Sequence, residues 1–317
     1  MSIEHPPIPR TAGALGPGGS GLLGRRRRPK ERAIRAFLAV CGFLSVATTI
    51  GIVATLSFQA IEFFRDVPLR DFLFDTDWSA LIAPNHYGIW PLIVGTLKIV
   101  LVSAIVGVPL GIGTAIYLSE YASSGLRRRL KPALEILAGV PTVVLAYFAL
   151  SFVTPVLIRP LFPNADFYNA LSAGLVVGVM IVPVIASVSE DAMSAVPRTL
   201  REGAYGLGAS KMVVAMRVVL PASLSGVMAS IILGVSRAVG ETMIVAIAAG
   251  SCPRMDASLL KCSQTLTGYI VQAAFGDVGR GGTVFNSIFA VGAVLFLMTL
   301  GLNIASQRLV RRFRQVY

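Results

Sequence analysis

Charged residues are scarce in this sequence: Asp, Glu, Lys and Arg together make up only 14% of its 317 residues. Soluble domains carry about 25% charged residues, because charged side chains keep their surfaces in contact with water. Hydrophobic residues, by contrast, account for 55% of the chain. The composition therefore excludes an ordinary soluble domain of this length and indicates an integral membrane protein.

Signatures of catalysis and metal binding are also missing. The chain has two histidines, His5 and His86, and neither an H-E-x-x-H nor a G-x-S-x-G motif, which argues against an intramembrane enzyme. Its three cysteines include no C-x-x-C pair, the spacing typical of zinc and thiol redox sites. No G-x-x-x-x-G-K-[ST] motif occurs, so any ATP must be bound by another polypeptide. We expect no catalytic residue, no metal site and no cofactor in this chain.

Long uncharged runs are what the sequence does contain. A membrane-spanning helix needs about 20 apolar residues. The runs predict an all-α protein with six transmembrane helices, at residues 34–62 and at about 90–119, 133–158, 167–190, 218–249 and 283–307. The remaining segments are a disordered basic tail at 1–33, an extracytoplasmic segment at 63–89, a cytoplasmic loop at 191–217 and a basic tail at 311–317, with 90–310 forming the core.

The distribution of Lys and Arg predicts the orientation. A net charge of +12 would suggest nucleic-acid binding if the basic residues shared one face, but they lie in clusters between apolar runs. With six spans, both terminal segments and the segments 121–132 and 190–217 lie on one side and hold 20 of the 28 basic residues, whereas the other side holds 6. The positive-inside rule places the richer side in the cytoplasm. We therefore expect both termini in the cytoplasm, a lipid bilayer around the chain and no nucleic-acid partner.

A spaced motif lies in the loop between the fourth and fifth predicted helices. It reads Glu202-Gly203-Ala204, then Gly208, then Val218, and ends in Leu220-Pro221. Small residues let another protein approach the backbone closely, and Glu202 offers charge at the edge. The motif resembles the E-A-A-x3-G-x9-I-x-L-P loop of permeases from binding-protein-dependent ABC importers, with Gly203 and Val218 as the two departures. The resemblance implies that this loop couples the membrane helices to a separate ATPase; the alternative is an ordinary loop with small residues.

A second group of residues falls inside the fifth predicted helix, at Ser236, Arg237, Glu241 and Thr242. Arginine at membrane depth costs at least about 2.5–3.5 kcal/mol, so it faces the protein interior and has a partner. We expect Arg237 and Glu241 to share one face of this helix, because they are four residues apart. They are either an ion pair that fixes helix packing or part of a translocation pathway, in which Arg237 offers donors suited to an oxyanion.

The surrounding stretches extend the resemblance over roughly residues 35–310. Arg237 to Gly250 is similar to a signature of phosphate-specific permeases, as are Gly88–Thr96, Tyr117–Tyr121 and Leu130–Pro141. The similarity is closer to the PstC type than to the related PstA type. It implies the six-helix, MetI-like transmembrane domain of a type I ABC importer in the bacterial inner membrane. It also implies the partners of this chain: a PstA-type permease, two ATPase subunits, an extracytoplasmic phosphate-binding protein and the lipid bilayer.

Three further features leave alternatives open. Cys252 and Cys262 share one predicted extracytoplasmic loop, so they are either free or joined in a disulfide. Lys98, near the outer end of the second helix, is expected to extend its ammonium toward the membrane surface. Glycine and proline residues inside the spans indicate either ordinary kinks or hinges that line a pathway. They are Gly107, Pro109, Gly111, Gly113, Pro141 and Pro183.

Two other functions compete with phosphate import. The same scaffold could carry another oxyanion, such as sulfate or molybdate, because the loop at Glu202–Pro221 supports both equally. An ATP-independent transporter or channel, gated by Arg237 and Glu241, would leave that loop unexplained.

Overall fold

The computed structural model describes residues 29–276, 278–279 and 281–313, so most of the predicted tail at 1–33 and the end of the tail at 311–317 lie outside the described residues. The described part is helical and contains no strand, only an isolated bridge between Trp78 and Tyr87. Its longer helices are α1 (Pro29–Asp66), α3 (Trp90–Ile116), α4 (Ser124–Ala138), α7 (Ala170–Ser194), α11 (Leu224–Val239), α12 (Leu266–Phe275) and α13 (Thr283–Phe313). The short helices are α2 (Leu69–Phe74), α5 (Thr142–Phe148), α6 (Arg159–Leu161), α8 (Arg198–Gly206), α9 (Lys211–Val213) and α10 (Leu220–Ala222). Four π-helical segments complete the order: η1 (Tyr117–Tyr121), η2 (Ala149–Ile158), η3 (Val214–Val219) and η4 (Val245–Ala249).

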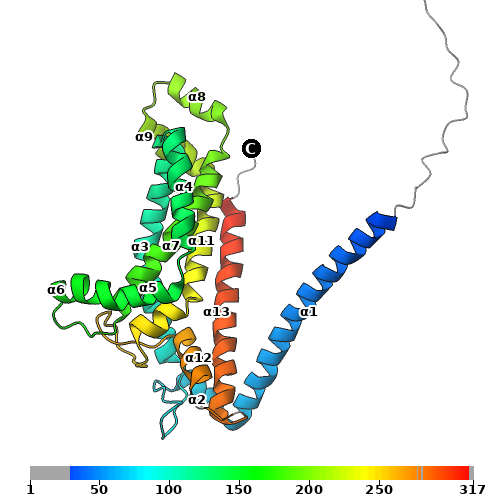
Figure 1. Cartoon of the computed structure of the whole chain (residues 1–317), viewed down its shortest axis with the longest axis vertical. Helices are drawn as coiled ribbons and strands as arrows, with labels where there is room; N and C mark the ends of the chain where they lie inside the picture. Colours follow the sequence, from blue (N-terminus) through cyan, green and yellow to red (C-terminus); the bar gives the residue numbers. More distant parts are fainter. Residues whose placement is uncertain (1–28, 277, 280, 314–317) are drawn as a thin grey trace, which may run out of the picture. The chain divides into compact units, whose positions relative to one another are not determined.

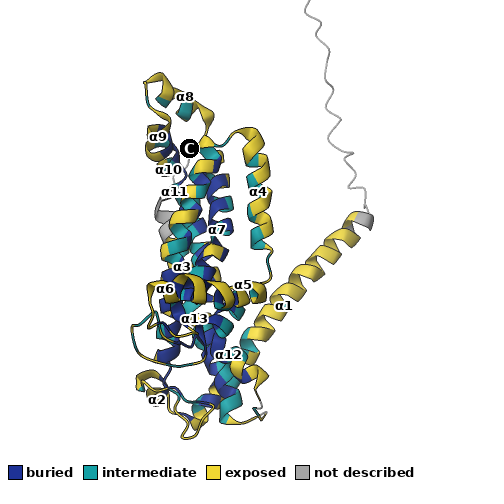
Figure 2. Cartoon of the chain, turned by 60° about the vertical axis from the view of Figure 1, so that its left-hand side comes forward, coloured by how far each residue is buried: buried dark blue, intermediate teal, exposed yellow. Residues whose placement is uncertain are grey.

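The chain divides into two compact units, Met1–Val53 and Ala54–Tyr317. The described part of the first unit is the beginning of α1, which carries no charged residue over residues 36–53 and is exposed along nearly all of that stretch. A helix that is apolar all round is typical of a membrane span. The second unit holds the remaining helices, and Figure 2 shows α7 as its most buried long helix.

Among the described residues, five helices are long and apolar enough to cross a membrane, and a sixth follows if one bent pair counts as a single span. The bent pair is Lys211–Ala222 and Leu224–Val239, whose axes meet at 76°. The prediction of an all-α membrane domain with about six spans is therefore confirmed. The expected continuous helices at 133–158 and 218–249 are not: the first is interrupted between α4 and α5, and the second is bent at Ser223 and ends at Val239.

Close packing of α3 against α7 forms the centre of the second unit, and glycines permit it. A Cβ at Gly107 would lie 2.7 Å from the carbonyl oxygen of Gly178, and one at Gly174 would lie 2.6 Å from the Cβ of Val102. Gly111 meets Ile185 at 2.7 Å in the same way. Small residues four apart on facing helices allow backbones to approach in membranes. Gly107 and Gly111 are therefore packing positions, which is a third explanation beside kinks and hinges.

Prolines behave differently in the spans. Pro109 and Pro183 lie inside α3 and α7, which continue past them, whereas Pro141 precedes α5 as its N-terminal cap.

Figure 1 shows α8 at one end of the second unit and α2 and α12 at the other. The two predicted loop regions, at 191–217 and 63–89, thus belong to opposite ends of the helix bundle.

Candidate functional site

The loop motif folds as helix α8 followed by a tight turn. Ala209 donates its backbone N–H to Ala204, and Gly208 donates to Tyr205, which closes the C-terminal end of the helix. Gly208 has φ of +81°, a left-handed conformation that glycine adopts without steric cost. The glycine of the motif is therefore required by the turn that ends α8.

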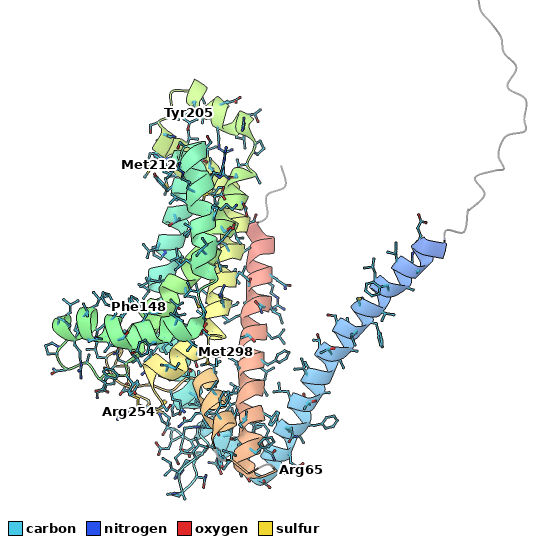
Figure 3. All side chains as sticks on the ribbon, viewed as in Figure 1. Arg65, Phe148, Tyr205, Met212, Arg254 and Met298 are labelled. Carbon is cyan, nitrogen blue, oxygen red and sulfur yellow. A yellow bond between two sulfur atoms is a disulfide. The ribbon has the colours of Figure 1, made fainter. Side chains whose placement is uncertain are left out.

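The outer surface of this loop is open and partly apolar. Glu202 and Gly203 are exposed, and a Cβ at Gly203 would meet nothing within 4 Å. Leu207 is 91% exposed, and Tyr205 and Met212 also face outward at this end of the unit (Figure 3). Exposed apolar side chains beside small residues are typical of a surface that another protein covers.

The inner surface of the loop packs on the bundle. Ala204 and Leu220 are half-buried against a cluster that includes the buried Val214 and Val219. Pro221 lies in the first turn of α10, where the missing N–H is tolerated, and the chain bends just beyond it. The motif thus runs from an exposed helix to the bend at which the fifth span begins.

An ion pair that is largely shielded from water fastens α8 to the bundle. Arg201 of α8 donates from Nη2 to Glu120 Oε1 at 3.1 Å, and Glu120 lies in η1, which continues α3. The same guanidinium donates to the carbonyl oxygens of Met193 at 2.7 Å and Val196 at 2.6 Å, at the C-terminal end of α7. Sequence analysis gave no role to Arg201, and Glu120 appeared there only within the Tyr117–Tyr121 stretch.

A second set of charges fastens α4 to α7. Glu190 is fully buried in α7 and accepts hydrogen bonds from Arg127, from Lys131 at 2.9 Å and from Ser194 at 2.9 Å. Lys131 also pairs with the exposed Asp191 at 2.6 Å. Sequence reasoning missed this site, although one signal was present: Glu190 is an acidic residue directly at the end of the fourth apolar run.

The two charge sites enclose a cleft of about 360 Å³ beside α8. Its walls carry Glu120, Arg127, Ser194, Arg201 and Glu202, among others. Of the predicted coupling residues, the structure therefore brings Glu202 close to the buried pair, whereas Leu220 and Pro221 lie at the bend.

The second predicted site differs from its expected geometry. Helix α11 ends at Val239, with Gly240 as its C-cap, so Arg237 and Glu241 do not share one helical face. Arg237 is exposed, whereas Glu241 is 8% exposed and its Oε1 accepts the backbone N–H of Ile244 at 3.3 Å. Among the described residues, no ion pair joins Arg237 to Glu241. The expectation that Arg237 and Glu241 share one helical face was wrong, because the helix ends at Val239, before Glu241. Of the two alternatives, the ion pair is therefore not seen among the described residues, and the pathway role stays a prediction.

The polar neighbours of this site are distributed over two other helices. Ser236 donates to Asn303 of α13 at 3.3 Å, and Thr242 donates to the carbonyl oxygen of Gly240 at 3.2 Å. The backbone carbonyl of Glu241 accepts the hydroxyl of Thr267, at the start of α12, at 2.7 Å. The break after α11 is thus held in place by polar contacts, with the Arg237 guanidinium left facing outward from this chain.

At the opposite end, residues 251–265 form a strap across the starts of α3 and α7. A disulfide joins Cys252 to Cys262 within it. Lys98 of α3 is 8% exposed and donates to the carbonyl oxygen of Asp256 at 2.9 Å and to its carboxylate at 3.2 Å. The expectation that Lys98 extends toward the membrane surface was therefore wrong, because a partner from a distant loop neutralises it inside the protein.

The segment before α3 packs beside this strap. Trp78 stacks edge-on against Tyr269 of α12, with ring centroids 4.7 Å apart. The backbone N–H of Asp77 holds the pKa of the nearby Asp75 carboxyl below its usual range, with a further contribution from His86.

Within the described residues, no group of His, Cys, Asp and Glu is arranged to hold a metal ion.

Comparison with known proteins places this geometry in a family. Residues 107–315 match the model of the binding-protein-dependent transport system inner membrane component. A probable ABC transporter permease protein, YqgH, of Bacillus subtilis is 31% identical and covers 87% of this chain and 89% of its own length. The phosphate transport system permease protein PstC of Pasteurella multocida is 32% identical over 90% of this chain and 92% of its own.

Solved structures give the same fold. A bacterial ABC transporter involved in the import of the acidic polysaccharide alginate matches with a TM-score of 0.62 at 14% identity, over 91% of this chain and all of that chain. The MetNI methionine ABC transporter, in an inward-facing conformation, matches with a TM-score of 0.55 at 19% identity, over 74% of this chain and all of that chain. The chain therefore belongs to the inner membrane components of binding-protein-dependent transport systems, with phosphate permeases of the PstC type among its relatives.

Proposed function

We propose that this chain is one permease subunit of an ATP-driven importer of inorganic phosphate. The observation that carries the proposal is the likeness to PstC permeases over about nine-tenths of both chains. In the proposed complex the chain pairs with a PstA-type permease, two ATPase subunits and an extracytoplasmic phosphate-binding protein. ATP binds to the ATPase subunits and not to this chain.

The α8 loop is the proposed docking site for the ATPase. Its exposed Leu207, Tyr205 and Met212 offer apolar contact, and Gly203 leaves room for a close approach. Glu202 supplies a charge at the rim of the adjacent cleft. Closure of an ATPase dimer against this loop would move the membrane helices as rigid bodies.

The proposed orientation places α8 in the cytoplasm and α2 with the 251–265 strap outside the cell. Two independent features support it: the excess of Lys and Arg on the side of α8, and the disulfide at the other end. Disulfides persist on the oxidising side of the bacterial inner membrane. Both termini are then cytoplasmic.

Arg237 is the proposed contact for the anion in the pathway, with Ser236, Glu241 and Thr242 around it. Its guanidinium is exposed on α11 and presents the planar donors that suit a tetrahedral oxyanion. Glu241 is held by Ile244, so its carboxylate does not occupy the donors of Arg237. An intramembrane Arg with free donors is a functional site by default.

Uptake of labelled phosphate, at low external phosphate in cells lacking this gene, tests the proposal. We expect the wild-type chain to restore uptake and Arg237→Gln to lower it about 10²-fold, since an electrostatic contact in a dry pathway is lost. Glu202→Ala should lower uptake through weaker coupling. Arg65→Gln, which removes an exposed partner of Glu62, is the matched control and should leave uptake unchanged.

Competition and assembly decide between the remaining functions. Block of wild-type uptake by sulfate or molybdate would move the substrate to another oxyanion. Uptake that persists without the ATPase subunits would contradict an ATP-driven importer. Normal uptake by Arg237→Gln, in a complex that still assembles in the membrane, would make Arg237 a structural residue.

A further inference from the structure

Arg201 connects three elements that are separate in the sequence. Its Nε and Nη2 donate to Glu120 Oε1 in η1, at 3.3 and 3.1 Å. Its Nη2 also donates to the carbonyl oxygen of Met193, in the last turn of α7, and its Nη1 donates to that of Val196, two residues beyond the end of α7. Since Arg201 itself belongs to α8, one guanidinium joins the proposed docking helix to both central helices, α3 through η1 and α7 directly.

This pair is shielded from water, unlike most charges at this end. The side chains of Arg201 and Glu120 are 16% and 5% exposed, whereas those of the neighbouring pair Lys131 and Asp191 are 30% and 62% exposed. A shielded pair resists separation, because breaking it leaves a buried charge without a partner. Ser119 adds a hydrogen bond to the same Glu120 oxygen at 2.9 Å, which fixes the carboxylate from a second side.

Helix α8 has few other attachments. None of its residues is fully buried, and Ala204 is the member that reaches the cluster beneath it. A load applied to the outer surface of α8 therefore passes into the bundle through Arg201, through Ala204 and along the chain that leads into η3. The Ala204 contact is apolar and can slide, whereas the Arg201 contacts are directional and fix the orientation of α8.

We propose that Glu120 and Arg201 form the joint through which movement of α8 is transmitted to α3 and α7 together. The inference rests on the proposed function, because a load on α8 exists only if an ATPase docks there. Both residues are positioning residues: neither needs to touch phosphate or ATP. The planar fork of arginine suits this role, since it donates in three directions at once and a lysine ammonium cannot match that geometry.

The test uses the complete importer, reconstituted in lipid vesicles with its partner permease and ATPase subunits and supplied with its binding protein. ATP hydrolysis and labelled phosphate uptake are measured in the same vesicles. For Glu120→Gln we expect hydrolysis to persist while phosphate moved per ATP falls about tenfold, within the usual range of coupling between linked sites. Asp191→Asn, a matched carboxylate-to-amide change on α7 that leaves Glu120 and Arg201 intact, should keep the wild-type ratio.

Further variants keep the test decisive if Glu120→Gln does not assemble. Arg201→Lys retains the charge but loses the fork, and should give an intermediate ratio. The double variant Glu120→Gln with Arg201→Gln should fall no further than the lower single variant, because the two residues act as one joint.

Several outcomes would overturn the inference. An unchanged ratio of phosphate moved per ATP in both Glu120→Gln and Arg201→Lys would do so. This includes the case in which ATP hydrolysis and phosphate uptake fall in equal proportion. Failure of both single variants to assemble would make the pair a folding element instead. Absence of ATP-dependent uptake by the wild-type complex is a different result, since it would refute the proposed function itself.

Discussion

The two ends of the helix bundle are stabilised by different means. The α8 end relies on charge: Glu190 and Glu120 are buried and hold cations from other elements. The opposite end relies on covalent and steric closure, with the Cys252–Cys262 disulfide and a strap that packs directly on Gly95. The α8 end is thus held by polar contacts between side chains, whereas the opposite end is held by a covalent bond and by close contact between backbone segments.

The largest expected effect comes from removing the charge of Glu190. Glu190→Gln would leave Arg127 and Lys131 facing each other beside a buried amide, and loss of one buried partner costs about 3–5 kcal/mol. We expect the lower part of that range, because both cations remain partly open to water. Thermal unfolding of the purified protein measures the loss, and hydrogen exchange should rise in α4.

A matched change at an exposed pair calibrates this result. Glu62→Gln breaks the pair with Arg65, whose members are 54% and 69% exposed, and such pairs contribute about 0–1 kcal/mol. Equal losses from Glu190→Gln and Glu62→Gln would show that charge is not what holds the α8 end together.

The second prediction makes the same substitution at both ends. A Cβ at Gly95 would lie 2.0 Å from the backbone oxygen of Gln264, so Gly95→Ala must displace the strap. We expect a loss toward the upper end of the about 1–3 kcal/mol typical of overpacking. Gly203→Ala, in α8, meets nothing within 4 Å and should be neutral or slightly stabilising, because alanine favours a helix. Relative to the wild type, the unfolding midpoints of the two variants should therefore shift in opposite directions, or the shift for Gly95→Ala should be several times larger. Equal shifts would show that the two ends do not differ in how tightly they are packed.

The smallest of the three effects is expected from the disulfide. Cys252→Ser with Cys262→Ser opens a loop whose two ends are 10 positions apart, and closing loops of this order contributes about 2–3 kcal/mol. The remaining contact between Lys98 and Asp256 should keep the strap in place, so uptake is expected to persist at moderate temperature. Reductant should lower the unfolding temperature of the wild type but not of the double variant, and Cys41→Ser serves as the control. A wild type that is insensitive to reductant would contradict a closing role for this bond.

Much of the fold could be predicted from the sequence because membrane spans follow from hydropathy alone. The apolar runs at 283–307 and 167–190 correspond to α13 and α7 within a few residues. The motif from Glu202 to Pro221 also predicted a surface loop, since its small residues and its spacing are local properties. Its role in coupling stays a prediction.

Interruptions within spans could not be predicted in the same way. Gly240 ends α11, yet glycine is common inside membrane helices, and nothing local shows that the chain turns there. The i,i+4 argument for Arg237 and Glu241 presumed a continuous helix and failed for that reason. The bend at Ser223, whose hydroxyl donates to the carbonyl oxygens of Val219 and Leu220, likewise leaves no trace in the hydropathy of the sequence.

Long-range charge pairing was equally inaccessible. Lys98 and Asp256 are 158 positions apart, and Arg201 and Glu120 are 81 apart. Each residue alone looks like an ordinary charge near a membrane surface, and only the packing of α3 against later segments brings the partners together.

The distance between Lys98 and Asp256 also has a consequence for biosynthesis. The ribosome must add 158 residues after Lys98 before its partner exists. At about 5–20 residues per second, that interval is about 8–30 s. During that time α3 carries an unneutralised ammonium group into the insertion machinery, and water or lipid phosphate must host it. Final burial of Lys98 is thus a late step of assembly, which makes it a natural reporter of whether the chain has finished folding in the membrane.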